Sequence, residues 1–113
     1  MSCCHYVVSG RVQGVGFRRF VELRAGKLGI NGWVRNLKNG KVEILAFAES
    51  EKLQIFEKQI AQGPALAKVQ DVHKTDMALE QLPKKFDSFK STEHVFVTHD
   101  NGDKELDWLE TKT

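Results

Sequence analysis

The chain has 113 residues, of which 41% are hydrophobic and 28% are charged, and its formal net charge is +2. A chain of this length fits one domain with an ordinary core and is too short for two. The small net charge, without a long run of basic residues, gives no argument for a nucleic-acid surface or a polybasic membrane surface.

The apolar segments and the cysteines indicate the cellular compartment in which the protein is expected. No apolar stretch approaches the ~20 residues that span a bilayer, and the N-terminus lacks the charged and apolar regions of a signal peptide. Cys3 and Cys4 are adjacent, whereas a disulfide framework needs separated cysteines. Together with His5, the two cysteines could begin a zinc site, but the sequence has no further ligands at the spacing that such a site needs. We therefore expect a reduced, cytoplasmic protein without a structural metal and without membrane association.

Strand-like and helix-like patterns alternate at the start of the chain. The apolar run 6–8, which ends at Ser9 and Gly10, predicts a buried first strand. From Phe17 onward, apolar residues recur three, four and seven positions apart, which predicts a helix with one buried face. Gly29 is the expected stop signal of this helix.

A hairpin is the strongest local signal of the middle region. The segments 33–37 and 42–47 predict a second and a third strand, and Asn39-Gly40 between them favours a tight turn in which both residues have positive φ. We interpret Trp33 as a packing residue and Arg35 as a solvated strand residue.

A second helix and a less regular end follow the hairpin. Ser50 is a fair N-cap, and Gly63-Pro64 is expected to end the helix. Its predicted buried stripe consists of Leu53, Phe56 and Ile60. The segment 67–72 predicts a fourth strand, and either 86–91 or 94–98 supplies a fifth.

The order strand, helix, strand, strand, helix, strand is typical of the α+β, ferredoxin-like βαββαβ sandwich. Right-handed crossovers place both helices on one face of an antiparallel-rich sheet. We expect a domain over residues 1–91. Residues 92–113 form a C-terminal extension, either an extra edge strand or a flexible tail.

The most informative stretch is the sequence Gly-Arg-Val-Gln-Gly-Val-Gly-Phe-Arg at 10–18, followed eighteen positions later by Asn36. Glycines tolerate positive φ and close backbone approach, so this loop can turn several N–H groups toward one point. The next helix adds partial positive charge at its N-terminus, and Arg18 adds a full charge. These features predict a pocket for a tetrahedral anion such as phosphate.

Two other interpretations of the loop fail. It lacks the Gly-Lys-Ser/Thr end of a Walker A loop, and Arg19 stands where a dinucleotide fingerprint needs its third glycine. Residues 13–20 are also similar to the RNA-recognition octapeptide. That octapeptide exposes aromatic side chains on a central strand, whereas Phe17 and Phe20 belong to a helical stripe. We therefore expect no nucleic-acid partner.

The segments 10–18, 28–29, 32–36 and 39–43 resemble the acylphosphatase family, over about residues 5–91 of this chain. The family's ferredoxin-like fold agrees with the element order reached independently. The resemblance implies a monomeric enzyme that hydrolyses a small-molecule acyl phosphate to a carboxylate and inorganic phosphate, without a metal or other cofactor. Inorganic phosphate or sulfate is then a product-like ligand.

The resemblance also implies roles for individual residues. The backbone amides of Val12, Gln13, Gly14, Val15, Gly16 and Phe17 hold the phosphoryl oxygens. Arg18 clamps them bidentately, and Asn36 orients the attacking water through its side-chain amide. Arg18 and Asn36 are thus the expected catalytic residues. A non-catalytic module that binds an anion or a partner with the same loop remains the alternative.

Overall fold

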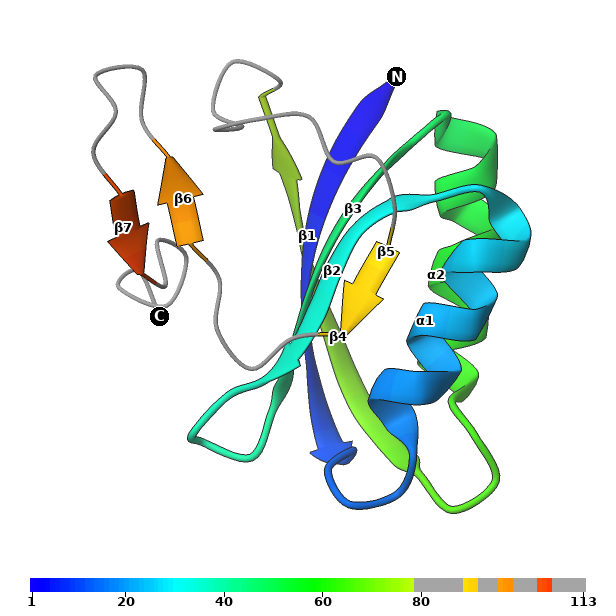
Figure 1. The fold of residues 1–113 in the computed structure, drawn as a ribbon. Coiled ribbons are helices and arrows are strands. Elements are labelled where there is room, and N and C mark those ends of the chain that lie inside the picture. Colours follow the sequence, from blue (N-terminus) through cyan, green and yellow to red (C-terminus); the bar gives the residue numbers. More distant parts are fainter. Residues whose placement is uncertain (79–88, 92–95, 99–103, 107–113) are drawn as a thin grey trace.

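The computed structural model describes residues 1–78, 89–91, 96–98 and 104–106. Figure 1 shows the order of the elements along the chain, which confirms the predicted βαββαβ arrangement through β4. The elements are β1 (Ser2–Arg11), α1 (Phe17–Leu28), β2 (Asn31–Asn36), β3 (Val42–Ala48), α2 (Ser50–Gln62), β4 (Lys68–Met77), β5 (Phe89–Ser91), β6 (Phe96–Thr98) and β7 (Lys104–Leu106). In the described part of the chain, neither helix is long and apolar enough to cross a membrane.

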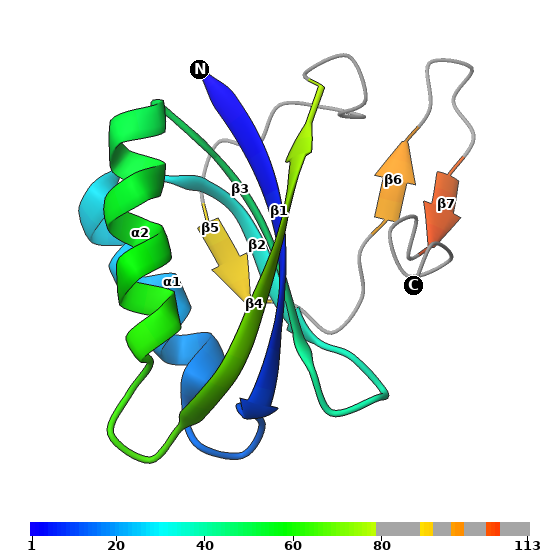
Figure 2. The same ribbon diagram turned by 180° about the vertical axis from the view of Figure 1, so that it is seen from behind.

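One five-stranded sheet forms the centre of the molecule, with the strand order β4-β1-β3-β2-β5. The pairs β1–β3, β1–β4 and β2–β3 are antiparallel, and β5 runs parallel to β2. Both helices lie on the same face of the sheet (Figures 1 and 2). This arrangement is the predicted ferredoxin-like sandwich.

The fifth strand comes from the first of the two candidate segments. Phe89–Ser91 pairs with β2, in the register Gly32–Phe89 to Val34–Ser91. The second candidate does not join this sheet, because Phe96–Thr98 pairs with β7 in a separate two-stranded sheet. Residues 86–88 of the predicted strand lie outside the described residues.

The helix boundaries agree with the sequence signals, with one correction. Gly29 follows α1 in the left-handed conformation, with φ of 69°, and its N–H caps the helix. At α2 the predicted N-cap Ser50 is wrong. Ser50 is the first helical residue, and Glu49 is the N-cap without a side-chain cap hydrogen bond. The chain leaves β3 in extended conformation through Glu49, and the Glu49 carbonyl accepts from the N–H groups of Lys52 and Leu53.

The core lies between the helices and the sheet. Alternate residues of β1 and β3 face the helices and pack against the buried stripe of each helix. Tyr6 of β1 meets Phe56 of α2 edge to face, with ring centroids 6.1 Å apart. The Tyr6 hydroxyl donates to Glu57 Oε2 at 2.6 Å, and Lys74 of β4 lies 2.9 Å from the same oxygen. Burial and the hydrogen bond to Glu57 raise the pKa of Tyr6 well above its usual range.

The opposite face of the sheet is also buried, which corrects the interpretation of Arg35. Arg35 and Glu43 are paired residues of β2 and β3, only 1% and 0% exposed. Arg35 Nε lies 2.6 Å from Glu43 Oε1, and His5 Nε2 lies 2.8 Å from Glu43 Oε2. The Arg35 guanidinium also lies over the ring of Trp33, 5.6 Å from its centroid. Trp33 is a packing residue as predicted, but Arg35 is not solvated, because it packs and pairs on a buried face.

The two cysteines lie on opposite faces of β1, and both are buried free thiols. Burial, with a smaller contribution from Cys4, raises the pKa of Cys3 to about 12. The pKa of Cys4 is raised mainly by burial as well. Both thiols therefore stay protonated at neutral pH and are weak nucleophiles.

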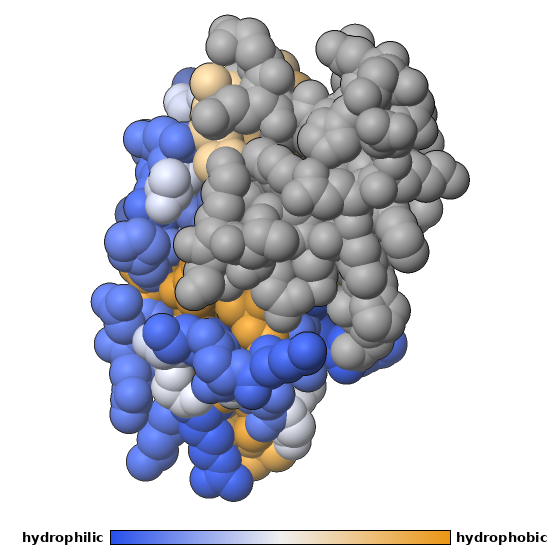
Figure 3. Space-filling model, turned by 90° about the vertical axis from the view of Figure 1, so that its left-hand side faces the viewer, coloured by the Kyte–Doolittle hydropathy of each residue, from blue (hydrophilic) through white to orange (hydrophobic). Residues whose placement is uncertain are grey.

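The two-stranded sheet of β6 and β7 stands on the side of the central sheet opposite the helices (Figures 1 and 2). Figure 3 views the molecule from this side. Among the residues coloured there, hydrophilic side chains predominate, with smaller hydrophobic areas between them. Trp33 and Arg35 alternate with Val34, which packs in the core beneath the helices, so they face this side and the helices cannot account for their burial.

Candidate active site

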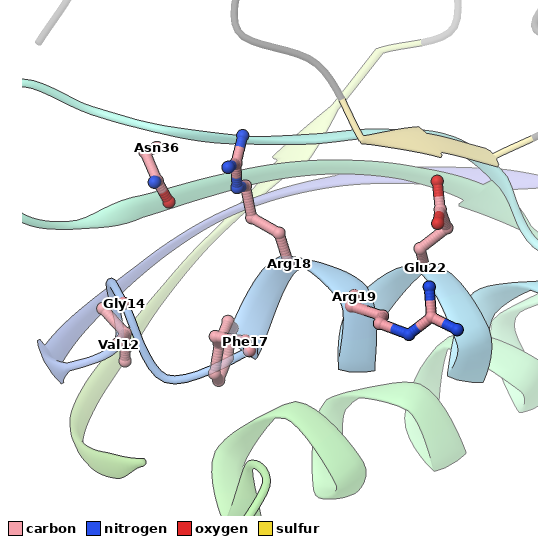
Figure 4. Close-up of a pocket in the computed structure, with 8 residues that line it drawn as sticks. Val12, Gly14, Phe17, Arg18, Arg19, Glu22 and Asn36 are labelled. Carbon is pink, nitrogen blue, oxygen red and sulfur yellow. The ribbon is translucent and has the colours of Figure 1, made fainter. Parts of the chain in front are cut away.

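A pocket of about 290 Å³ opens where the loop between β1 and α1 approaches the end of β2. It is lined by Val12, Gly14, Gly16, Phe17, Arg18, Arg19, Glu22 and Asn36. Figure 4 shows seven of these residues with labels. The pocket thus brings together the two predicted catalytic residues, Arg18 and Asn36, which are far apart in the sequence.

The backbone of the loop has the conformation that its glycines favour. Gly14 and Gly16 have φ of 73° and 77°, in the left-handed region that side-chain-bearing residues rarely adopt. Gly16 is the N-cap of α1, and its carbonyl accepts the first helical hydrogen bond, from the N–H of Phe20 at 3.0 Å. The N–H groups of the first helical turn have no intrahelical acceptor and lie beside the pocket. They are suited to bind an anion.

Arg18 and Asn36 reach this space from different elements. Arg18 lies in the first turn of α1 and extends toward β2 (Figure 4). Asn36 is the last residue of β2, two positions after the core residue Val34, so the alternation of the strand turns it to the helix side. Its amide points from β2 toward the loop (Figure 4).

The side-chain oxygen of Asn36 is a distinctive feature of the pocket. Oδ1 of Asn36 is buried and has no hydrogen-bond partner among the described residues. Buried polar atoms are nearly always hydrogen-bonded in native proteins, and an exception in a pocket points to a ligand or a water as the partner. The atom can accept a hydrogen bond from a molecule that enters the pocket.

Two of the predicted loop residues do not line the pocket, and two residues that sequence reasoning missed do. Gln13 and Val15 are absent from the lining, and Val15 packs against the core. Arg19 and Glu22 were not among the predicted site residues, but both line the pocket. Glu22 had a signal in the sequence, because it follows Arg18 by one helical turn and so shares its face.

The charges around the pocket favour an anion close to the loop. The first turn of α1 contains no acidic residue, and it carries Arg18 and Arg19 next to the positive end of the helix dipole. Glu22 places one carboxylate a turn further along. Within the described residues, no group of three or more histidine, cysteine, aspartate or glutamate side chains could hold a metal ion.

Comparison with known proteins agrees with this geometry. The family model "Acylphosphatase" matches residues 4–90. An acylphosphatase of Koribacter versatilis is 47% identical over 81 residues, which are 72% of this chain and 74% of that protein. One of Pseudomonas paraeruginosa is 42% identical over 80 residues, which are 71% of this chain and 88% of that protein.

A solved structure shows the same likeness in three dimensions. The crystal structure of acylphosphatase from Bacillus subtilis superposes with a TM-score of 0.75 and 39% sequence identity. The match covers 81% of this chain and 99% of that one. The chain therefore belongs to the acylphosphatase family, and its activity is the hydrolysis of acyl phosphates.

Proposed function

We propose that the chain hydrolyses the carboxyl-phosphate bond without a metal, by direct attack of a water on a phosphoryl group held in the pocket. The backbone amides of the loop from Val12 to Phe17 and the guanidinium of Arg18 bind the phosphoryl oxygens. Asn36 orients the water. The observation that carries this proposal is the pocket itself, which joins the glycine loop, Arg18 and the buried Oδ1 of Asn36.

The proposed roles follow from the bonding groups that each residue offers. Arg18 presents several N–H donors in a planar fork that matches two phosphoryl oxygens. The loop amides and the dipole of α1 act on the same charge. Asn36 Oδ1 accepts a hydrogen bond from the water, which directs a lone pair of the water oxygen toward phosphorus.

The reaction requires few catalytic groups beyond these residues. Phosphoryl transfer tends to pass through a loose transition state, so positioning and charge stabilisation contribute more than activation of the nucleophile. The leaving group is a carboxylate whose conjugate acid has a pKa of ~4 in solution, so it departs without protonation. Neither a general acid nor a divalent ion is needed for these two steps.

The test is the hydrolysis of benzoyl phosphate in excess chelator by the wild type, Arg18→Ala and Asn36→Ala. We expect chelator-resistant activity of the wild type. Each variant should lose at least ~10²-fold in kcat/KM, as is typical when a key charge-stabilising donor is removed. Arg24→Ala and Asn31→Ala are the matched controls, because neither residue lines the pocket.

Three results would contradict the proposal. One is a wild type whose activity is lost in chelator, and another is an Arg18 or Asn36 variant as active as the wild type. The third is a wild type that binds inorganic phosphate without turning over benzoyl phosphate, which would favour a non-catalytic anion-binding module instead.

We propose further that the protein acts as a cytoplasmic monomer on a small acyl phosphate, without nucleic-acid or membrane partners. The two buried free thiols support a reducing compartment. Inorganic phosphate or sulfate is the expected product-like ligand of the loop. We also propose a catalytic domain over residues 1–91 and an extension over 92–113, which the family match over 4–90 supports.

A further inference from the structure

We propose that Gln13 is a positioning residue for the reaction. Its side chain fixes the phosphate-binding loop to the β2–β3 turn, so that the loop amides and Asn36 keep the relative position that in-line attack requires. This inference rests on the proposed function of the loop and Asn36, and it adds a role for a side chain that does not line the pocket.

The hydrogen bonds of Gln13 join the loop to both sides of the hairpin. Gln13 Nε2 donates to the carbonyl oxygen of Leu37 at 2.7 Å and to that of Lys41 at 2.9 Å. A side-chain amide nitrogen has two hydrogens, so these two bonds use its full donor capacity. The N–H of Leu37 also donates to the Lys41 carbonyl, at 2.8 Å. Gln13 therefore joins the two carbonyls at the base of the turn.

The position of these bonds connects them to catalysis. Leu37 directly follows Asn36, and Gln13 lies between Val12 and Gly14, which both line the pocket. The loop and Asn36 belong to different elements, and the Gln13–Leu37 bond spans 24 residues of sequence. The bond therefore links the residue beside the proposed water-orienting group to the middle of the proposed phosphate-binding loop.

Packing gives the loop little support at its glycines. A Cβ atom placed on Gly14 or Gly16 would find no heavy atom of the described residues within 4 Å, apart from its own chain neighbours. Both residues also have an intrinsically permissive backbone. Directed hydrogen bonds from Gln13 can supply the fixed geometry that these open positions lack. A displacement of about 1 Å between reacting groups can cost on the order of 10²-fold in rate.

The experiment compares the wild type with Gln13→Met, which keeps the length of the side chain and removes its donors. With benzoyl phosphate, we expect kcat to fall roughly 10- to 100-fold. The inhibition constant of inorganic phosphate should stay within about threefold of the wild type, because Arg18 and the loop amides remain. Gln54→Met, at an exposed position of α2, is the matched control and should behave like the wild type.

A double-mutant cycle separates positioning from a merely structural role. If Gln13 acts through Asn36, Gln13→Met should cost less than about threefold in kcat when Asn36 is already alanine. The same tenfold or greater loss in both backgrounds would overturn the inference, and so would a Gln13→Met enzyme with wild-type kcat. The inference would also be overturned if kcat and the affinity for phosphate fell together, in proportion to a loss of folded protein measured by circular dichroism.

These outcomes are distinct from a failure of the proposed function. If Asn36→Ala retains full activity, the water-orienting role itself is wrong. If Asn36→Ala and Arg18→Ala are impaired while Gln13→Met is fully active, only the positioning role of Gln13 is wrong.

Discussion

Gly16 illustrates how one residue couples the start of a helix to the pocket proposed to bind phosphate. Its left-handed backbone turns the chain from the loop into α1, and it presents the first-turn N–H groups to the pocket. Gly26 lies in the same helix with an ordinary helical backbone, and no atom of the residues that the structure describes lies within 4 Å of the position of a Cβ there. The same substitution at these two glycines therefore tests backbone conformation alone.

We expect Gly16→Ala to destabilise the protein by about 1–2 kcal/mol, because a non-glycine residue in the left-handed region is strained. Gly26→Ala should stabilise it by up to about 1 kcal/mol, because alanine is the better helix former. Urea unfolding of the two variants measures both effects. Equal changes of the same sign would contradict this explanation of the loop conformation. Benzoyl phosphate hydrolysis should fall only in Gly16→Ala.

The conformation of the glycine loop and its proximity to Arg18 could be predicted from the residue types of a short motif. The glycines, the helix start and Arg18 are adjacent in sequence, so local conformation alone brings them together. The Oδ1 of Asn36 has no hydrogen-bond partner in the described part of the chain, and this feature could not be predicted in this way. The side-chain bonds of Gln13 could not be predicted either, because both features depend on the distance between the loop and the hairpin.

At the scale of the elements, β1, β2 and β3 carry an ionic group on the face of the sheet away from the helices. Glu43 accepts from Arg35 and lies beside His5, so three neighbouring strands share one buried carboxylate. Removing one partner of a buried ion pair leaves the other charge uncompensated, which is far more costly than losing a surface pair. The stability of the sheet should therefore depend on Glu43.

We expect Glu43→Gln to lower the free energy of unfolding by about 3–5 kcal/mol, because it removes the carboxylate that faces the buried Arg35 guanidinium at 2.6 Å. Glu51→Gln, at an exposed position of α2, should have little effect. The double variant Arg35→Met with Glu43→Leu should recover much of the loss. Urea unfolding measures all three. If Glu43→Gln is as stable as the wild type, the ionic group does not stabilise the sheet.

The strands also show where sequence patterns stop being informative. Arg35 alternates with Val34 in β2, and a charged residue on the alternate face of a strand usually points to solvent. Its pairing with Glu43 depends on the register of β2 against β3, and its burial depends on what lies over that face. Neither property is present in a local pattern.

At the scale of the molecule, the pocket and the two-stranded sheet of β6 and β7 lie on different sides of the central sheet. Asn36 and α1 belong to the helix side, whereas β6 and β7 stand on the opposite side (Figures 1 and 2). Trp33 and Leu45 are 5% and 2% exposed, yet they alternate with residues that face the helices. We therefore expect the C-terminal extension to contribute stability and not chemistry.

A chain that ends after Ser91 tests this separation. If the extension covers Trp33 and Leu45, the shortened chain exposes both to water, and its free energy of unfolding should fall on the order of 3 kcal/mol. Its kcat for benzoyl phosphate should remain within about threefold of the full chain under conditions where both are folded. A large loss of kcat would place the extension in the active site. Unchanged stability would show that it does not protect this face.

The sequence by itself determined the order of the elements, the glycine loop, the helix boundaries near Gly29 and Gly63, and the family, because each depends on residues that are close along the chain. Tertiary structure alone decided the fifth strand, the buried pairing of Arg35 with Glu43 and the hydrogen bonds of Gln13 to the hairpin. These three features have the same physical cause. Each depends on strand register or on the approach of distant segments, which burial across the whole molecule fixes and no local pattern encodes.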